Sequence, residues 1–342
     1  MRVFVIVFLL VILCNGCKTV KTTTYPLTGD DFVIAFGSCN KQDEDNLLWD
    51  DVLKNKPSVW IWGGDNIYSD TDNFREMRKD YEEQRYQDGY RELKKSVDVI
   101  GTWDDHDYGL NDGGAEWKMK AQAQELFLNF MDVPKNDPRR NQEGVYHAKT
   151  YHTNAGDVKV IVLDTRYFRS PLTKNLGDDG KRFMPNPKGE GTILGAEQWQ
   201  WLTKELTNST ATFNIIVSSI QVLSNKHGFE AWGNFPAEVD KLFKLIKVSK
   251  AKRVLLLSGD RHISEFSEIN ISDLGYPLID FTSSGLTHTY EAYSGEENPY
   301  RVGEVVNQKS FGLLKLNMKN HHVKMQMIGD GNRVLNELEQ AY

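Results

Sequence analysis

The sequence predicts an α/β domain that occupies residues 31–342. Short apolar runs with the length of buried strands alternate with amphipathic or charged segments of helical length. No internal repeat, low-complexity segment or linker interrupts the sequence of this region, which is long enough to bury a sizeable core. We therefore expect one α/β domain with several strands.

The first half of this region predicts three buried strands with helices between them. Strands are expected at residues 31–39, 58–65 and 96–105, and helices at 47–56, 73–95 and 116–131. Pro57 ends the first helix, and we expect Gly89 to interrupt the second.

The second half continues the alternation. Strands are expected at residues 145–154, 157–166, 213–222, 252–260 and 277–285, and helices at 194–209 and 236–250. A hairpin of residues 311–319 and 321–329 is expected to close the chain. The long loop at 170–193, which contains Gly and Pro, is expected to cover a site.

An apolar run at the N-terminus indicates export. Arg2 precedes an unbroken apolar stretch from Val3 to about Cys14, which is too short for a membrane span and fits a signal-peptide core. The small residues before Cys17 resemble a bacterial lipoprotein signal, and an ordinary secretory signal is the alternative. We expect residues 1–16 to be a signal peptide, Cys17 to be acylated and residues 17–30 to tether a periplasmic or cell-surface protein to a bacterial membrane.

The overall charge excludes one class of partner. The net charge is −7 and the isoelectric point is about 5.7, and no basic run is present to neutralise nucleic-acid phosphates. A small phosphate-bearing substrate remains compatible with this charge, since bound metal would reverse the local sign. After lipidation of Cys17, Cys39 would be the only thiol of the folded part, either buried and inert or a metal ligand.

Four predicted strands each end in a cluster of polar residues. These clusters are GSCN (37–40), GGDNIYSD (63–70), DDHD (104–107) and SGDRH (258–262). Ligands of open α/β sheets bind beyond the carboxyl ends of the strands, so we expect the four clusters to meet. Their residue types are those that ligate metals, and the sequence therefore predicts a metal site.

Individual residues support this interpretation to different degrees. Tyr68 follows Asp65 by three residues, so both can reach one ion, although a cap and a packing residue are the alternative. In an extended segment the spacing of Asp260 and His262 would put both side chains on one side, so they could reach one ion together. His106 can ligate a metal or act as an acid. A cap or turn role is the alternative for either Asp104 or Asp107. A Cys39 thiolate beside carboxylates requires a cation.

Two common catalytic motifs are missing from the sequence. There is no GxSxG elbow and no P-loop lysine, which disfavours acyl transfer by serine and nucleotide binding of the Walker type.

The ordered set GSCN, GGDNIY, WDDHD, LDTR, SSIQV, SGDRH and FTSSGLTH resembles the alkaline phosphatase D (PhoD-like) family of the calcineurin-like metallophosphoesterases. The resemblance spans roughly residues 31–330. It implies a metallophosphoesterase-type sandwich of two mixed sheets flanked by helices. The GDNIY element is also similar to the GDxxY element of purple acid phosphatases, in which tyrosine binds iron.

The resemblance also implies a metal centre of Fe³⁺ with Ca²⁺ beside it. It assigns Cys39 and Tyr68 to the iron, Asp65 to a bridging position, and Asp105 to the second metal, with Asn111 as a further candidate. It places Asp260 and His262 where relatives carry metal ligands, and His106 facing the phosphate.

Two features depart from the family pattern. The N-terminal β-sandwich domain that members often carry would find no room before residue 31. A histidine of the middle motif is missing, with Gln221 nearby, which leaves other divalent ions as alternatives for the second metal.

The expected activity is metal-dependent hydrolysis of phosphate esters by an alkaline phosphatase-type phosphomonoesterase. A phosphodiesterase or phospholipase of the same fold is one alternative, and a non-catalytic metal- or ligand-binding surface lipoprotein is another. Arg166 would bind phosphate or serve the structure. His227 and Trp232 would line the pocket or pack in a loop, and the remaining histidines considered are surface or strand residues: His147, His152, His321 and His322. The sequence does not specify an oligomeric partner.

Overall fold

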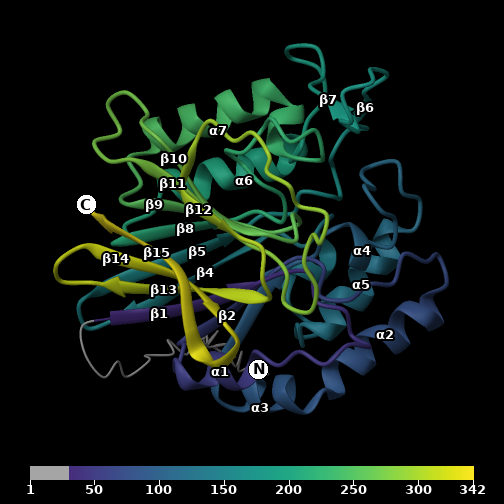
Figure 1. The fold of residues 1–342 in the computed structure, drawn as a ribbon, viewed down its shortest axis with the longest axis horizontal. Coiled ribbons are helices and arrows are strands. Elements are labelled where there is room, and N and C mark those ends of the chain that lie inside the picture. Colours follow the sequence, from purple (N-terminus) through teal and green to yellow (C-terminus); the bar gives the residue numbers. More distant parts are fainter. Residues whose placement is uncertain (1–30) are drawn as a thin grey trace, which may run out of the picture.

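The computed structural model describes residues 31–342, which form four layers (Figure 1). Two mixed β-sheets pack face to face, and helices cover both outer faces. This arrangement confirms the expected sandwich of two mixed sheets flanked by helices. The predictions for residues 1–16 and 17–30, including acylation of Cys17, fall outside the described residues.

The first sheet has six strands in the order β15-β14-β13-β1-β2-β3. Its parallel part is β1 (Asp31–Gly37), β2 (Val59–Gly63) and β3 (Asp98–Thr102). Its antiparallel part is β13 (Ser310–Asn317), β14 (His322–Gly329) and β15 (Arg333–Ala341). The carboxyl ends of three neighbouring parallel strands therefore share one edge of this sheet.

The second sheet has seven strands in the order β12-β10-β11-β9-β8-β5-β4. Its parallel strands are β5 (Gly156–Val162), β8 (Phe213–Val217), β9 (Val254–Ser258) and β11 (Leu278–Ser283). Antiparallel strands flank them: β4 (His147–Thr153), β10 (Ser264–Ile269) and β12 (Arg301–Val306). A separate two-stranded hairpin, β6 (Thr173–Lys174) with β7 (Phe183–Met184), projects from the body beside α7 (Figure 1).

Helices cover the sheets asymmetrically. The six-stranded sheet is covered by α1 (Trp49–Lys54), α2 (Phe74–Tyr86), α3 (Asp88–Ser96), α4 (Asp105–Tyr108) and α5 (Lys120–Phe130). The seven-stranded sheet is covered by α6 (Gly195–Thr207) and α7 (Pro236–Ser249). Single 3₁₀ turns lie at Pro138–Asn141, Trp232–Asn234 and Asp330–Asn332.

Aromatic side chains bind the first helical layer to its sheet. The rings of Trp49 on α1 and of Trp60 and Trp62 on β2 pack edge to face, with centroids 5.0 to 5.6 Å apart. A second apolar layer lies between the two sheets, where Phe36 of β1 meets Phe281 of β11. These packed layers hold the strand ends in fixed positions.

The predicted break at Gly89 is wrong, because the chain breaks at Gln87 and Gly89 lies inside α3. A Cβ at position 89 would come within 2.7 Å of the Trp49 ring. This glycine therefore permits close packing of α3 on α1 and is not a helix breaker.

The chain does not close with the predicted hairpin of β13 and β14. A third antiparallel strand, β15, follows and forms the edge of the six-stranded sheet. Its sequence RVLNELEQA is rich in polar residues because much of the strand is exposed, so it lacked the apolar run by which the other strands were identified. Strand β12 is also largely exposed or half-buried, and β10 lacks an apolar run because its buried residues include Ser264, Glu265 and Ser267.

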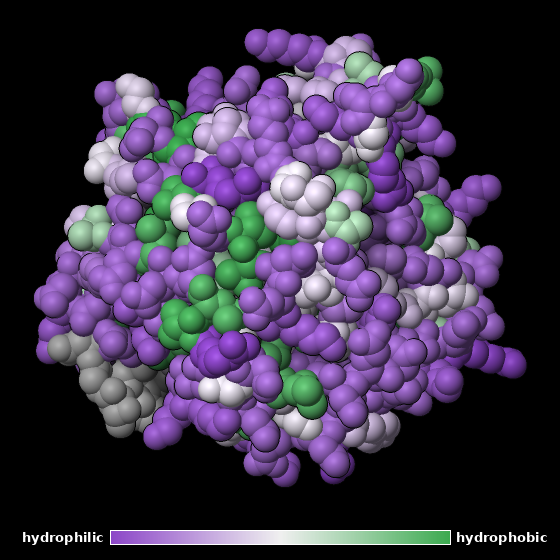
Figure 2. All heavy atoms as spheres, viewed as in Figure 1, coloured by the Kyte–Doolittle hydropathy of each residue, from purple (hydrophilic) through white to green (hydrophobic). Residues whose placement is uncertain are grey.

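Figure 2 shows a face covered mainly by hydrophilic residues, with hydrophobic residues gathered over β12 and β15. Across residues 31–342, no helix combines the length and apolar character needed to cross a lipid bilayer.

Candidate metal centre

The four polar clusters converge at the carboxyl ends of β1, β2, β3 and β9. Two glycines permit the close approach of the loops that carry them. A Cβ on Gly259 would lie 2.6 Å from the carbonyl oxygen of Gly63, and a Cβ on Gly64 would lie 2.6 Å from the Cβ of Asp104. The loops that follow β2, β3 and β9 can therefore approach one another this closely only because both positions lack side chains.

A thiol, a carboxyl, a phenol and an imidazole form the first part of the centre. Cys39 Sγ lies 3.3 Å from Asp65 Oδ2, and Tyr68 Oη lies 3.3 Å from the same oxygen. His262 Nε2 lies 3.0 Å from Tyr68 Oη. Cys39, Asp65 and His262 present ligand atoms within 4.8 Å of one another, so the structure brings these four side chains together as one group.

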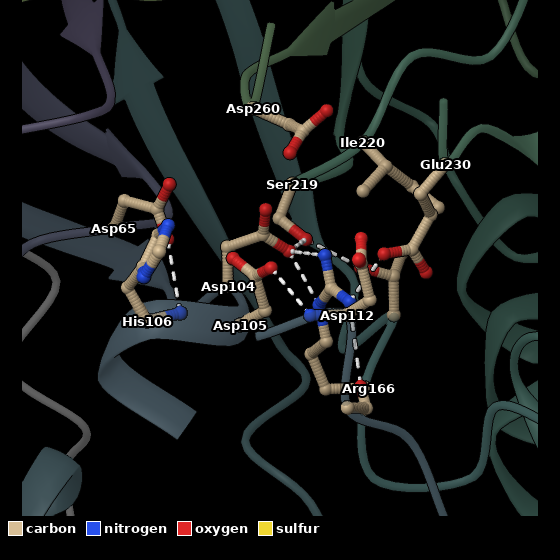
Figure 3. A network of polar contacts seen from close by, with 12 residues as sticks. Asp65, Asp104, Asp105, His106, Asp112, Arg166, Ser219, Ile220, Glu230 and Asp260 are labelled. Atoms are coloured by element: carbon tan, nitrogen blue, oxygen red, sulfur yellow. Dashed lines mark hydrogen bonds and ion pairs between the residues drawn. The ribbon is translucent and has the colours of Figure 1, made fainter. Parts of the chain in front are cut away.

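Three carboxylates form the second part of the centre. Oxygen atoms of Asp104, Asp105 and Asp260 lie within 4.8 Å of one another, and Asp65 and His106 form a similar group with Asp105. Figure 3 shows these carboxylates facing a common space. Asp105 thus belongs to both groups, which makes the centre continuous from Cys39 to Asp260.

The backbone at the centre adopts uncommon conformations. Cys39, Asp65, Asp260 and His262 all have positive φ angles, of 59°, 51°, 69° and 54°. Such conformations disfavour residues with a side chain and persist where the surroundings or a function require them. Here they turn four candidate ligands toward one space.

Burial makes the anionic forms of these groups unfavourable. Burial, together with neighbouring Asp65, raises the pKa of the Cys39 thiol and of the Tyr68 phenol. Burial also raises the pKa of Asp65, and it raises the pKa of Asp260 to about 7. A cation among them would reverse this effect and stabilise the deprotonated ligands.

The side chains fit the metals that the family resemblance implies. Asp104 Oδ2 and Asp105 Oδ1 are buried oxygens without a hydrogen-bond partner, which is costly unless a ligand satisfies them. The all-oxygen group of Asp104, Asp105 and Asp260 suits a hard cation. The group of Cys39, Asp65 and Tyr68 adds sulfur and phenol donors, which suit a transition metal.

Arg166 lies behind the metal centre and is fully buried (Figure 3). Its Nε donates to Asp104 Oδ1 over 2.6 Å, and its Nη1 donates to Glu230 Oε2 over 2.5 Å. Arg169 pairs with the other oxygen of Glu230 over 2.7 Å. The structure places Arg166 outside the open cavity, where it orients Asp104, and this position favours the structural alternative for its role.

His106 is held by a carboxylate that the sequence interpretation did not select. Its Nδ1 lies 2.5 Å from Asp70 Oδ2, and its ring stacks on Tyr68 with centroids 4.1 Å apart. Burial lowers the pKa of His106, but Asp65 and Asp70 outweigh this and raise it to about 10. The two carboxylates therefore favour the protonated form of the imidazole, which faces the cavity.

A cavity of about 170 Å³ opens onto the centre. Its lining includes the predicted residues Asp105, His106, Asn111, Asp260 and His262. Loops far apart in the sequence add Asp112, Arg182, Phe229, Glu230, Arg261 and Tyr290. Arg261 lies within the SGDRH cluster and Asp112 directly follows Asn111. No sequence pattern marks the other four residues, because only the folding of the loops brings them to the strand ends.

Several candidates have other positions or roles. Asn111 is exposed and donates to Asp112 Oδ2 over 2.8 Å, so it lies at the rim of the cavity. Asp107 caps the turn after β3, because its Oδ1 accepts from the backbone N–H of Asp104 over 2.7 Å. Gln221 donates to Glu265 and Thr282 away from the centre.

His227 and Trp232 pack in their loop. His227 Nδ1 accepts from the backbone N–H of Phe229, and Trp232 Nε1 donates to Ser218 Oγ over 2.9 Å. Their neighbours Phe229 and Glu230 are the residues of this loop that line the cavity.

Two further residues at the centre belong to the segment FTSSGLTH. Ser284 Oγ lies 3.0 Å from Cys39 Sγ and accepts from the backbone N–H of His262 over 2.7 Å. His288 packs edge to face on both Tyr68 and His262, with centroids 4.9 and 4.5 Å away. Both residues lie in a motif that carries the family resemblance, and this membership is the sequence feature that could have identified them.

Comparisons with known proteins agree with this geometry. A family model described as PhoD-like phosphatase matches residues 34–336. Alkaline phosphatase D of Bacillus subtilis (strain 168) is 26% identical in an alignment of 297 residues that covers 73% of this chain and 50% of that protein. The chain thus spans about half the length of this curated relative.

Solved structures show the same fold at low identity. The structure of PhoD has a TM-score of 0.69 at 19% identity, covering 94% of this chain and 69% of that chain. GAP50, the anchor in the inner membrane complex of Plasmodium, has a TM-score of 0.58 at 15% identity, over 91% of this chain and 89% of its own. A dimetal phosphatase from Danio rerio has a TM-score of 0.56 at 14% identity, over 91% and 99%.

The match to the family model contains all four strand-end clusters that build the metal centre and extends over both sheets. The chain therefore belongs to the PhoD-like phosphatase family.

Proposed function

We propose that this protein is a metal-dependent phosphoric ester hydrolase and that its substrates are small phosphate monoesters. The observation that carries the proposal is the group of buried carboxylates with unpartnered oxygens, Asp104 and Asp105, beside an open cavity. Membership of the PhoD-like phosphatase family supports the same reaction class.

Fe³⁺ and Ca²⁺ are the metals that we propose for the centre. Cys39, Asp65, Tyr68 and His262 would hold the iron, and Asp105 and Asp260 would hold the calcium with Asp104 beside them. Bound metal ions of this kind supply an activated water nucleophile and neutralise charge on phosphate oxygens. The excess of carboxylates at the centre would balance the positive charge of these bound ions.

The protein's own residues provide positioning and proton transfer. His106 faces the cavity, and its protonated form, which Asp70 favours, can donate a hydrogen bond or a proton to the oxygen of the leaving group. Asp70 holds the Nδ1 side of that ring, which leaves Nε2 for the substrate. Arg166 and Ser219, which both contact Asp104 Oδ1, keep that carboxylate in place.

Hydrolysis of p-nitrophenyl phosphate by purified protein, with elemental analysis of the same sample, tests this proposal. We expect turnover, stoichiometric bound metal, and loss of at least about 10³-fold in rate after the metal is removed by chelator, since metal activation supplies several kcal/mol. Re-addition of metal should restore the rate. Cleavage of bis-p-nitrophenyl phosphate in preference to the monoester would favour a phosphodiesterase, and absence of both metal and turnover would favour a ligand-binding lipoprotein.

Export and lipid anchoring form a separate proposal that rests on the N-terminal sequence. The apolar run before Cys17 supports cleavage ahead of this residue and acylation of its thiol. We expect cells that express the full chain to incorporate labelled palmitate into the protein, and Cys17→Ser to abolish the label. Equal labelling of the variant would contradict the proposal, and secretion of unlabelled, cleaved protein would indicate an ordinary signal peptide.

A further inference from the structure

We propose that Arg182, carried by the β6–β7 hairpin, binds the substrate phosphate and favours dianionic monoesters over monoanionic diesters. The inference rests on the proposed phosphoric ester hydrolysis and assigns to it a specificity-determining residue.

The other arginines near the cavity are committed to protein partners. Arg166 and Arg169 are fully buried and are paired with Asp104 and Glu230. Arg261 lines the cavity, but both oxygens of Glu296 bind its Nη2 over 2.7 and 2.9 Å, and its guanidinium lies 4.2 Å from the Phe229 ring centroid. Arg261 is thus a fixed part of the cavity wall, and Arg166 and Arg169 do not line the cavity.

Arg182 differs from these arginines in its exposure. Its side chain is 51% exposed and forms an ion pair with Asp112 at the cavity. Its guanidinium also lies 5.4 Å from the Phe183 ring centroid. Among the lysines and arginines that line this cavity, Arg182 is therefore the one whose charged end solvent and substrate can reach.

The backbone holds Arg182 beside the cavity while its side chain stays exposed. The backbone N–H groups of Arg182 and Phe183 both donate to the carbonyl oxygen of Gly228 over 2.9 Å. Gly228 has a φ angle of 82°, and a Cβ at this position would lie 2.3 Å from the Lys181 side chain. The hairpin thus rests directly on the loop that delivers Phe229 and Glu230 to the cavity.

The charge of Arg182 determines which ester it favours. Near neutral pH a phosphate monoester approaches a dianion, whereas a diester is a monoanion with one fewer non-bridging oxygen. A guanidinium presents paired N–H donors that match two oxygens of one phosphate. Arg182 can exchange the carboxylate of Asp112 for such a pair of oxygens, and the gain is larger for the dianion.

The experiment compares Arg182→Ala, Arg182→Lys and wild-type protein with both p-nitrophenyl esters. We expect Arg182→Ala to lower kcat/KM for the monoester about 10- to 100-fold and for the diester by less than about 3-fold, the range for a lost charge-assisted hydrogen bond. The inhibition constant of inorganic phosphate should rise by a similar factor. Arg182→Lys should recover part of the monoester activity, because it keeps the charge and loses the paired donors.

The matched control is Lys181→Ala, which removes a cation from the same hairpin but does not line this cavity. We expect this variant to keep the wild-type ratio of monoester to diester activity. An equal fall in kcat/KM for both esters in Arg182→Ala, or an unchanged inhibition constant of phosphate, would overturn the inference. Either result would indicate that the ion pair between Arg182 and Asp112 only holds the hairpin in place.

Failure of the proposed function has a different signature. Wild-type protein would then cleave neither ester, and calorimetric titration of the metal-loaded protein with inorganic phosphate decides the role of Arg182 without turnover. Weaker phosphate binding by Arg182→Ala than by wild type supports a phosphate contact, and equal binding contradicts it.

Discussion

Replacing Asp65 with asparagine is expected to lower the rate of phosphate ester hydrolysis by about 10³-fold or more. Asp65 lies in contact with Cys39 and Tyr68 and belongs to the group that contains Asp105 and His106. An asparagine keeps the shape of the side chain but loses the negative charge that would join the two parts of the centre. Kinetics with p-nitrophenyl phosphate, with metal content measured in parallel, check this result.

The same substitution should leave the fold intact. Because burial raises the pKa of Asp65, its ionised form is unfavourable without a cation, so a neutral amide is tolerated there. Asp72→Asn, which alters an exposed carboxyl of the loop after β2, is the matched control and should hydrolyse the ester at the wild-type rate. Hydrolysis by Asp65→Asn within about 10-fold of wild type would remove Asp65 from the proposed mechanism.

Replacing Arg166 with alanine is expected to lower the free energy of unfolding by about 3–5 kcal/mol. The guanidinium is fully buried between Asp104 and Glu230, so its removal leaves Asp104 without a counter-charge in a water-poor environment and leaves Glu230 with Arg169 alone. Asp104 would also lose its orientation next to the metal centre, and we expect activity to fall with stability. Urea unfolding followed by circular dichroism measures the first effect.

Arg91→Ala is the comparison for Arg166→Ala, because Arg91 forms an ion pair in which both partners are exposed. The side chain of Arg91 is 56% exposed and that of its partner Asp88 is 97% exposed. Loss of this ion pair should lower the free energy of unfolding by less than about 1 kcal/mol, the usual range for surface pairs. Equal destabilisation by the two variants would show that the buried network contributes no more than a surface pair.

The sequence located the parallel strands because their burial on two faces leaves a continuous apolar run. Residues 254–258 of β9 read VLLLS, and each of them is buried. Strands with an exposed face or edge, such as β15, do not carry that signal. The break assigned to Gly89 failed for a related reason, since the requirement for glycine at that position comes from Trp49 on another helix.

The candidate site was predictable where a strand leads directly into it. Cys39, Asp65, Asp105 and Asp260 each follow a buried strand within a few residues, and the rule for strand ends brings them to one edge. The positions of Arg166 and Arg182 did not follow from any such rule. Arg166 is paired with Glu230, which lies on a loop more than sixty residues away in the sequence. The position of Arg182 depends on the contact of its hairpin with Gly228.

By itself the sequence determined the layered α/β architecture, the family and the four clusters of the metal centre. Each depends on local order along the chain, namely apolar runs, strand-end loops and short motifs. Only the tertiary structure decided which carboxylates remain unpartnered, which arginine is buried and which faces the cavity. These properties depend on distances between loops far apart in sequence, which packing sets and residue order alone does not display.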